Sequence, residues 1–148
     1  MRKLGSIVLC GALAVLVFAA VSSAKPRQEM FHLSATLNAG QEIPKQVVKD
    51  RRAHGRFTAT LSGTHLAWKL TFAKLTGPAT AAHIHVGAMG KSGNVVVPLC
   101  GPCKSGMSGT GTISAALLKT IRKHGTYVNV HTAKNPAGEI RGQLVAKG

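Results

Sequence analysis

The sequence predicts an all-β domain, an antiparallel, Greek-key-like β-sandwich or partly closed barrel of about eight strands with one short helix. Two observations support this class. Apolar and polar residues alternate along several short segments, and such alternation is typical of strands with one buried face. Turns rich in glycine separate these segments at short intervals, as they do in sandwiches and barrels.

The first half of the predicted domain contains the clearest strand patterns. Residues 31–37 alternate between apolar and polar types and predict a half-buried strand, which the polar loop 38–54 follows. Residues 57–61 and 66–72 alternate in the same way on either side of residues 62–64. Because a short turn that contains glycine joins them, we predict a β-hairpin.

The middle of the chain predicts three further strands. Residues 82–86 alternate after a Gly-Pro break, and the glycine-rich loop 87–93 follows them. Residues 95–97 are all valine, which predicts a strand buried on both faces, while Pro98 places that strand near a sheet edge or a strand end. Residues 109–113 show a weaker strand pattern.

The C-terminal part predicts a helix and a final hairpin. Ser114 is a suitable N-cap for a short helix, and Gly125 ends it. Residues 127–132 and 139–145 then predict two strands joined by a loop. The predicted core collects inward-facing residues from these segments: Phe31, Phe57, Leu61, Trp68, Leu70, Phe72, Ile84, Val128, Val130 and Ile140.

Residues 1–24 predict a cleaved secretory signal peptide. A positively charged start precedes an apolar stretch without charge, residues 4–21, and small residues lead up to Ala24. The alternative is a membrane anchor, for which this stretch is short. After cleavage, a basic segment, residues 25–29, leads into one secreted or periplasmic domain, residues 30–146, that does not span a membrane.

The chain is strongly basic, with a formal charge of +15 from 19 Lys and Arg against four Asp and Glu. Removal of the signal takes away two basic residues and leaves a formal charge of +13. This excess predicts attraction to anionic envelope or matrix polymers, with a merely solvated cationic surface as the alternative. Nucleic acid is not expected as a partner, because the basic residues are scattered and only one Trp and one Tyr could stack on bases.

The sequence contains few of the residue patterns that enzymes use for catalysis. No nucleophile elbow, phosphate loop or pair of carboxylates is visible, and four acids leave little for carboxylate-based hydrolysis. Cys100 and Cys103 form a Cys-Gly-Pro-Cys motif, which predicts a short-range disulfide outside the cytoplasm. A thiol redox pair is the alternative, but it needs a helix N-terminus to stabilise the thiolate, and residues 104–109 are a poor helix start.

Three predicted strands carry polar side chains opposite their aliphatic ones. His83 and His85 alternate with Ile84, and both strands of the final hairpin repeat this pattern. Because alternate strand residues share a face, these polar residues lie on faces that point away from the core. Six of them could form one polar cluster: His83, His85, Asn129, His131, Glu139 and Arg141.

Several short blocks of the sequence resemble the chordin-type (CHRD) domain. The most specific are residues 127–132, Tyr-Val-Asn-Val-His-Thr, and residues 136–142, Pro-Ala-Gly-Glu-Ile-Arg-Gly. Further matching blocks are residues 37–44, 81–85 and 94–97, so that the resemblance covers roughly residues 30 to 146. It implies an extracytoplasmic β-rich module like those of bacterial secreted proteins and of the animal protein chordin. The chain has one copy and lacks the cysteine-rich modules of chordin, so growth-factor binding does not carry over.

The histidines of the predicted cluster have the spacing of a metal site. A His-x-His pair on one strand face offers two imidazoles to one ion, and a neighbouring strand can supply the third. Imidazole suits copper or zinc, so a mononuclear site at His83, His85 and His131 is one hypothesis. The other is a structural hydrogen-bond network of the same six residues that fixes the sheet register. Both hold together if Glu139 orients an imidazole.

Three functional hypotheses follow for this domain. The first is a non-catalytic binding or structural module with a cationic surface, secreted or periplasmic. The second is a copper- or zinc-binding protein with a three-histidine site on the outer face of the sheet. Residues 83–85 locally resemble the paired copper ligands of copper/zinc superoxide dismutases, but the zinc-ligand loop of that family is missing. The third is a thiol redox protein that uses Cys100 and Cys103.

Overall fold

The computed structural model describes residues 29–46 and 50–148, and about half of them lie in antiparallel strands. The predicted signal peptide, residues 1–24, and all but the last residue of the basic segment 25–29 lie outside the described residues. No helix within the described ranges is long and apolar enough to cross a membrane.

Nine strands are formed by the described part of the chain: β1 (Met30–Asn38), β2 (His54–Ser62), β3 (His65–Ala73), β4 (Ala79–Val86), β5 (Val95–Cys100), β6 (Ser108–Thr112), β7 (Thr126–Thr132), β8 (Ile140–Gln143) and β9 (Val145–Lys147). A 3-10 helix (Ala39–Gln41) follows β1, and one α-helix, α1 (Ala115–Arg122), lies between β6 and β7.

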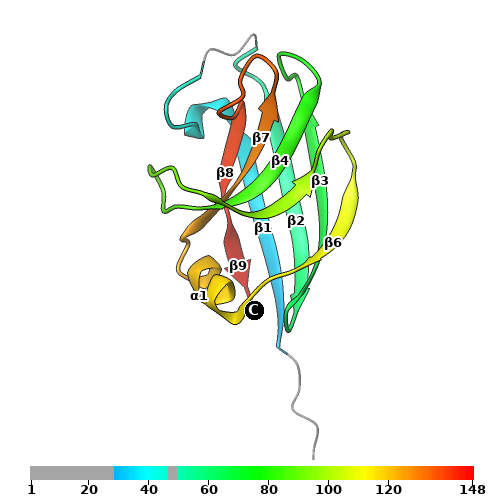
Figure 1. Cartoon of the computed structure of the whole chain (residues 1–148), viewed down its shortest axis with the longest axis vertical. Coiled ribbons are helices and arrows are strands. Elements are labelled where there is room, and N and C mark those ends of the chain that lie inside the picture. Colours follow the sequence, from blue (N-terminus) through cyan, green and yellow to red (C-terminus); the bar gives the residue numbers. More distant parts are fainter. Residues whose placement is uncertain (1–28, 47–49) are drawn as a thin grey trace, which may run out of the picture.

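The strands form one sheet in the order β5-β4-β7-β8-β1-β2-β3-β6, and β9 also pairs with β1. The sheet curls into a nearly closed barrel whose two edges are β5 and β6 (Figure 1). Because β1 lies between β2 and β8, the first strand is held beside the C-terminal hairpin. The predicted all-β fold class is therefore confirmed. Of the two architectures that the sequence allowed, a sandwich or a partly closed barrel, the chain forms the barrel.

Alternation along the strands separates inside from outside as expected. In β1 to β3 nearly every second side chain is buried, and the others face outward. Of the ten residues predicted for the core, nine are buried, and Phe72 is half-buried and packs against them. The predicted hairpin forms between β2 and β3, where Gly63 adopts a φ of 59° that favours glycine.

Helix α1 lies beside β9 at one end of the barrel (Figure 1). Ser114 caps it as predicted, because its Oγ accepts a hydrogen bond of 3.1 Å from the backbone N–H of Leu117. Ile121 is fully buried and anchors the helix to the core. The end of the helix differs from the prediction: His124, not Gly125, takes the left-handed conformation, with a φ of 55°.

Two strands differ from their sequence patterns. The predicted strand 139–145 is divided into β8 and β9, because the chain leaves β7 at Gln143 and continues along β1 from Val145. The valine strand β5 is buried only at Val97, while Val95 and Val96 are 47% and 39% exposed. The reason is its position at the edge of the sheet, where no further strand covers it.

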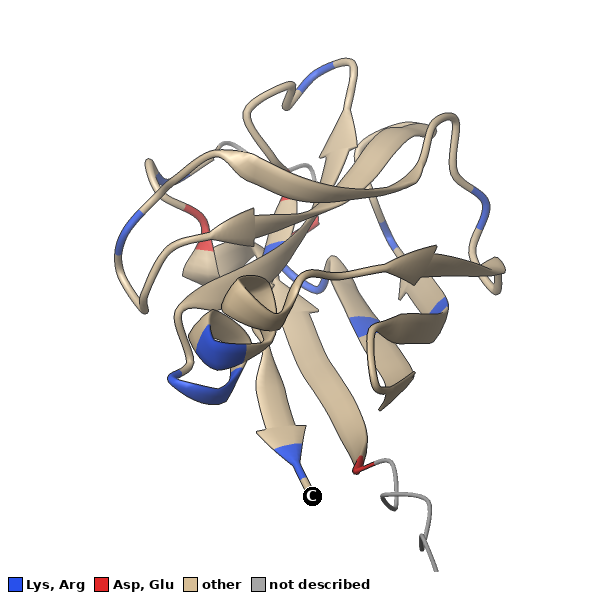
Figure 2. Cartoon of the chain, turned by 60° about the horizontal axis from the view of Figure 1, so that its bottom comes forward, with Lys and Arg blue, Asp and Glu red and all other residues tan. Residues whose placement is uncertain are grey.

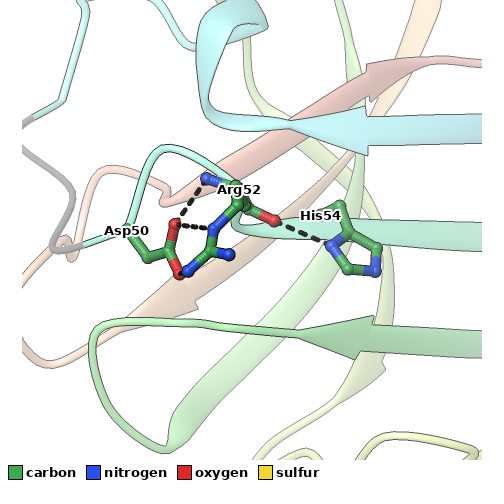
Figure 3. A network of polar contacts seen from close by, with 3 residues as sticks. All are labelled: Asp50, Arg52 and His54. Carbon is green, nitrogen blue, oxygen red and sulfur yellow. Dashed lines mark hydrogen bonds and ion pairs between the residues drawn. The ribbon is translucent and has the colours of Figure 1, made fainter.

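The entry into β2 is fixed by a small polar network (Figure 3). The carboxylate of Asp50 accepts hydrogen bonds from the backbone N–H and the guanidinium of Arg52, at 2.8 and 3.1 Å. The carbonyl of Arg52 in turn contacts Nδ1 of His54 at 2.8 Å. This is the one ion pair among the described residues, and it neutralises one of the few acids of the chain.

Candidate metal centre

β4, β7 and β8 lie side by side and arrange their polar residues in rows across the sheet. His83 of β4 is opposite Asn129 of β7, which is opposite Arg141 of β8. His85 and His131 lie two positions along their strands from His83 and Asn129, so they share the same face. Ladder register therefore brings three histidines from two strands together.

The three imidazoles form a compact group, and each offers a nitrogen within 4.8 Å of those of the other two. Nδ1 of His83 is 3.1 Å from Nε2 of His131. The ring centre of His85 is 5.6 Å from that of His83 and 5.7 Å from that of His131. His85 and His131 are each 8% exposed, and His83 is half-buried.

Backbone carbonyl groups orient two of these rings. Nδ1 of His85 lies 3.0 Å from the carbonyl oxygen of Gly93, and Nδ1 of His131 lies 3.0 Å from that of Pro136. Because a carbonyl oxygen only accepts, Nδ1 carries the hydrogen in both neutral rings, and Nε2 keeps its lone pair. Nε2 of His85 is buried and has no hydrogen-bond partner among the described residues. Metal-binding histidines are commonly oriented in this way.

The site favours neutral imidazoles, the form that binds metal. Burial lowers the pKa of all three rings, that of His131 to about 4. Repulsion between the imidazoles lowers the pKa further at His83 and His131, and the charge of Arg141 does so at His85. At neutral pH the three rings are therefore uncharged. Because Nε2 of His131 is the acceptor in its contact with His83, Nδ1 of His83 donates that hydrogen bond, and a metal bound between the two nitrogens would require this hydrogen to leave Nδ1.

The spacing of the nitrogens suits a single small ion. Two imidazole nitrogens that bind one Zn²⁺ at about 2.0–2.1 Å, at angles between about 90° and 110°, lie about 2.8–3.4 Å apart. The 3.1 Å between the His83 and His131 nitrogens falls in this range. His85 also offers a nitrogen within 4.8 Å of those of His83 and His131, so the third imidazole lies near the same point.

Tyr127 forms one wall of the histidine cluster. Its ring stacks on that of His85 with the centroids 4.9 Å apart and the planes 9° from parallel. The guanidinium of Arg141 lies over the Tyr127 ring, 3.4 Å from its centre. This stack of cation, phenol and imidazole restricts the His85 ring to small movements.

Side chains of β8 hold the loop 87–94 over the cluster. Arg141 donates hydrogen bonds of 3.3 and 2.7 Å to two carbonyl groups of this loop, and Gln143 donates one of 2.9 Å to a third. The same loop provides the Gly93 carbonyl that orients His85. Arg141 is thus a positioning residue of the site, with no imidazole among its hydrogen-bond partners in the described region.

Glu139 belongs to a neighbouring network in the β7–β8 hairpin. Its buried carboxylate accepts hydrogen bonds from Oγ1 of Thr132, from Nδ2 of Asn135 and from the backbone N–H of Thr76. Burial alone would raise the pKa of Glu139, but these hydrogen bonds outweigh it and lower the pKa. The two imidazoles are oriented by carbonyl groups, and Glu139 instead shapes the hairpin that carries the Pro136 carbonyl.

Glu42 is a buried member of the site that the sequence reasoning missed. It is 2% exposed, and its Oε2 accepts a hydrogen bond of 3.4 Å from Nδ2 of Asn129. Oε1 of Glu42 and Oδ1 of Asn129 are buried without a partner among the described residues. Burial raises the pKa of Glu42 to about 7, although Arg141 and Asn129 lower it. The available signal was its rarity: it is one of four acids and lies in the CHRD-like block 37–44.

The histidines lie on the outer face of the sheet, opposite the core, but this face is not open to solvent. Every residue of β7 is buried, on both faces. The polar face is covered by three connections: Glu42 lies on it from the segment after β1, the loop 87–94 binds Arg141, and the β7–β8 turn binds His131. Alternation shows which side of a sheet a residue occupies, but it cannot show that loops form a second layer there.

The two cysteines do not belong to this cluster: Cys100 lies opposite Ala82 of β4, and both cysteines pack with the core. Cys100 and Cys103 are joined by a disulfide that closes the turn after β5, with their Cα atoms 5.3 Å apart. No α-helix begins at Cys100, since β5 ends there and a turn follows. The helix N-terminus that a reactive thiolate of this motif would use is therefore missing from the described structure around it.

These features define a class of protein, a small antiparallel β-barrel with a buried three-histidine cluster under its loops. The chain belongs to the CHRD domain family, whose pattern matches residues 33–144. The resemblance seen in the sequence blocks is therefore correct, and one domain covers most of the chain. No curated protein and no solved structure matches the chain.

Proposed function

We propose that this protein is an extracytoplasmic, non-catalytic metal-binding module that holds one copper or zinc ion between His83, His85 and His131. One observation carries the proposal: three neutral imidazoles meet, and the buried Nε2 of His85 has no partner among the described residues. A buried polar atom without a hydrogen bond is costly, and a bound ion would remove that cost.

The donor set narrows the choice of ion. Three imidazoles with no carboxylate ligand suit zinc or copper better than calcium, magnesium or manganese, which prefer oxygen. Among the described residues, those whose ligand atoms converge within 4.8 Å are the three histidines alone, so neither Glu42 nor Glu139 belongs to the group. A fourth position would remain for water or for a ligand, as in three-histidine zinc sites.

Two observations support a location outside the cytoplasm. CHRD domains are modules of extracellular proteins, and this chain belongs to that family. The disulfide between Cys100 and Cys103 is of a kind that persists in oxidising compartments.

Metal titration of the full purified chain tests the site. The chain is stripped with a chelator and titrated separately with Zn²⁺ and with Cu²⁺, and the stoichiometry is measured by calorimetry and by elemental analysis. We expect one ion per chain in the wild type and none in the His83→Ala, His85→Ala variant. The matched control is His32→Ala, His65→Ala, which removes two exposed histidines and should keep the ion.

Two outcomes would contradict the proposal. One is unchanged stoichiometry in the His83→Ala, His85→Ala variant, provided that its circular dichroism matches the wild type. The other is absence of tight binding of either ion to the wild type. If the double variant does not fold, His83→Gln tests the half-buried ligand alone, with the same expected loss of affinity.

A further inference from the structure

The barrel has a second polar surface, on the outer faces of β1, β2, β3 and β6. These strands bury every second residue in the core and turn the others outward. Most of the outward residues near the middle of the surface are hydroxyl-bearing or cationic, with the exposed Ala67 and His32 beside them. This surface does not include the three histidines, which lie on β4 and β7.

Three adjoining hollows run along this surface. The central one has a volume of ≈ 700 Å³, and those at its two ends have volumes of ≈ 540 and ≈ 350 Å³. The central hollow shares Thr60, Ala67 and Thr110 with one neighbour and Arg56 with the other. Together they form a row of adjoining open hollows, the groove, along β2 and β3, which are nine residues long. At about 3.3 Å per residue the groove is about 30 Å long.

The register places cations and hydroxyls alternately along the groove. Thr58 of β2 lies opposite Ser34 of β1 on one side and opposite Lys69 of β3 on the other. Arg56 lies two residues before Thr58 on β2, so both face the groove, and it is opposite Thr71. Lys147 of β9 lies at the rim of the same central hollow.

No acidic residue lines any of the three hollows. The four acids of the chain lie elsewhere: Glu42 and Glu139 are buried, Asp50 is paired with Arg52, and Glu29 lies before β1. Figure 2 shows Lys and Arg spread over the loops and strands, with acidic positions few among them. Arg56 and Lys69 are exposed, line the central hollow and form no ion pair with another described residue.

We propose that this groove binds a linear anionic polysaccharide that carries carboxylate or sulfate groups. Guanidinium and ammonium groups attract the charges, while the Thr and Ser hydroxyls donate and accept hydrogen bonds with sugar hydroxyls. An extended groove of linked hollows suits a linear chain, and the absence of carboxylates avoids repulsion. The proposal does not depend on a bound metal, because the groove and the histidine cluster use different strands.

Two other anionic partners fit the groove less well. Single-stranded nucleic acid stacks its bases on exposed aromatic rings, but Trp68 is 7% exposed and Phe72 packs against the core. A lipid surface needs exposed apolar side chains next to the cations. None of the exposed large hydrophobic residues of the described chain, such as Met89 and Val95, lines the three hollows.

Retention on immobilised alginate, a linear polyuronate, tests the groove at low ionic strength with a chelator present. The variant Arg56→Gln, Lys69→Gln removes two groove charges. The matched control Lys119→Gln, Lys123→Gln removes the same charge from α1 and its C-terminus, outside the groove. We expect about tenfold weaker binding for the groove variant and less than about threefold for the control. Binding should also weaken with added salt, and neutral dextran should not bind.

Several results would overturn this inference. Equal losses in the two variants would show that only the net charge matters, and no retention at low salt would remove the partner altogether. Stronger binding to single-stranded DNA or to anionic lipid vesicles than to alginate would assign another partner. If the double variant is not folded, Thr58→Val, which keeps shape and charge, must still weaken retention. Because a chelator is present throughout, failure here leaves the metal proposal untouched.

Discussion

Glu42 is a buried carboxyl group whose charge state the barrel controls. Its folded-state pKa is raised from 4.5 to about 7, mainly by burial. A raised carboxyl pKa means that the folded protein binds the proton more tightly than the unfolded chain does. The stability that Glu42 contributes is thus fully present below pH 4.5 and is lost as the pH rises through about 7.

The variant Glu42→Gln should remove this pH dependence, because glutamine resembles the protonated acid. Relative to the wild type, we expect the variant to gain up to about 3 kcal/mol of unfolding free energy between pH 4 and pH 8. Urea unfolding of both proteins across that pH range measures the difference. A difference that stays constant with pH would show that Glu42 titrates alike in both states.

Glu139 behaves in the opposite way, because it is stabilised as an anion. Three hydrogen bonds to its buried carboxylate lower its folded-state pKa, so the stability it contributes is present above pH 4.5 and is lost as the pH falls. Glu139→Gln places an amide donor among these donors, and we expect a loss of about 2–3 kcal/mol at pH 7. Glu29→Gln, at an exposed position, is the control and should change the unfolding free energy little. A similar small effect at Glu139 would mean that the hydrogen bonds are not formed.

The loop 87–94 shows how one element determines the geometry of the histidine site. Gly93 is placed so close to β4 that an added Cβ would lie 2.0 Å from the carbonyl oxygen of Val86. Its own carbonyl orients His85 at 3.0 Å. Any larger residue at this position must move the loop away, and the carbonyl moves with it.

We therefore expect Gly93→Ala to weaken binding of copper or zinc by about 10- to 100-fold, the usual effect of losing a group that orients a metal ligand. Gly111→Ala is the matched control, because an added Cβ at Gly111 meets no atom within 4 Å. Competition with a chelator of known affinity measures both. Equal affinities for the two variants would show that the Gly93 carbonyl does not orient His85.

Local sequence patterns predicted most of the strands, but they did not predict the loops that cover the outer face of β4, β7 and β8. The alternation of residues 57–61 and 66–72 depends only on side chains within each strand, so it predicted β2 and β3 and their turn. The exposure of Val95 depends on which strand lies at the sheet edge, and the division at Leu144 depends on where β1 lies. The edge position of β5 and the position of β1 are properties of the whole sheet, and the pattern within one segment does not show which strands will be its neighbours.

The candidate site was predictable to the same extent. His83, His85 and His131 follow from alternation plus the pairing of β4 with β7. The contacts of the Gly93 and Pro136 carbonyl groups could not be predicted from residue type, because every residue has a backbone carbonyl. Glu42 could not be placed either, since 87 positions separate it from Asn129.

The distribution of charge over the whole molecule should make its stability sensitive to salt. Of the 14 Lys and Arg in the described ranges, 13 are exposed and only Arg141 is buried, whereas two of the four acids are buried. The surface cations therefore repel one another with few acids between them, and this repulsion destabilises the compact state.

We expect the melting temperature to rise by about 3–6 °C between 10 and 150 mM sodium chloride, as the screening length falls from about 30 to about 8 Å. The variant Lys104→Glu, Lys134→Glu reverses two exposed charges in loops and should show a smaller rise. Calorimetry at both salt concentrations, with a chelator present, measures the effect. A melting temperature that is constant or falls with salt would mean that the surface cations are spaced widely enough not to repel one another. The attraction of an anionic polysaccharide to the groove would then have to come from Arg56 and Lys69 alone.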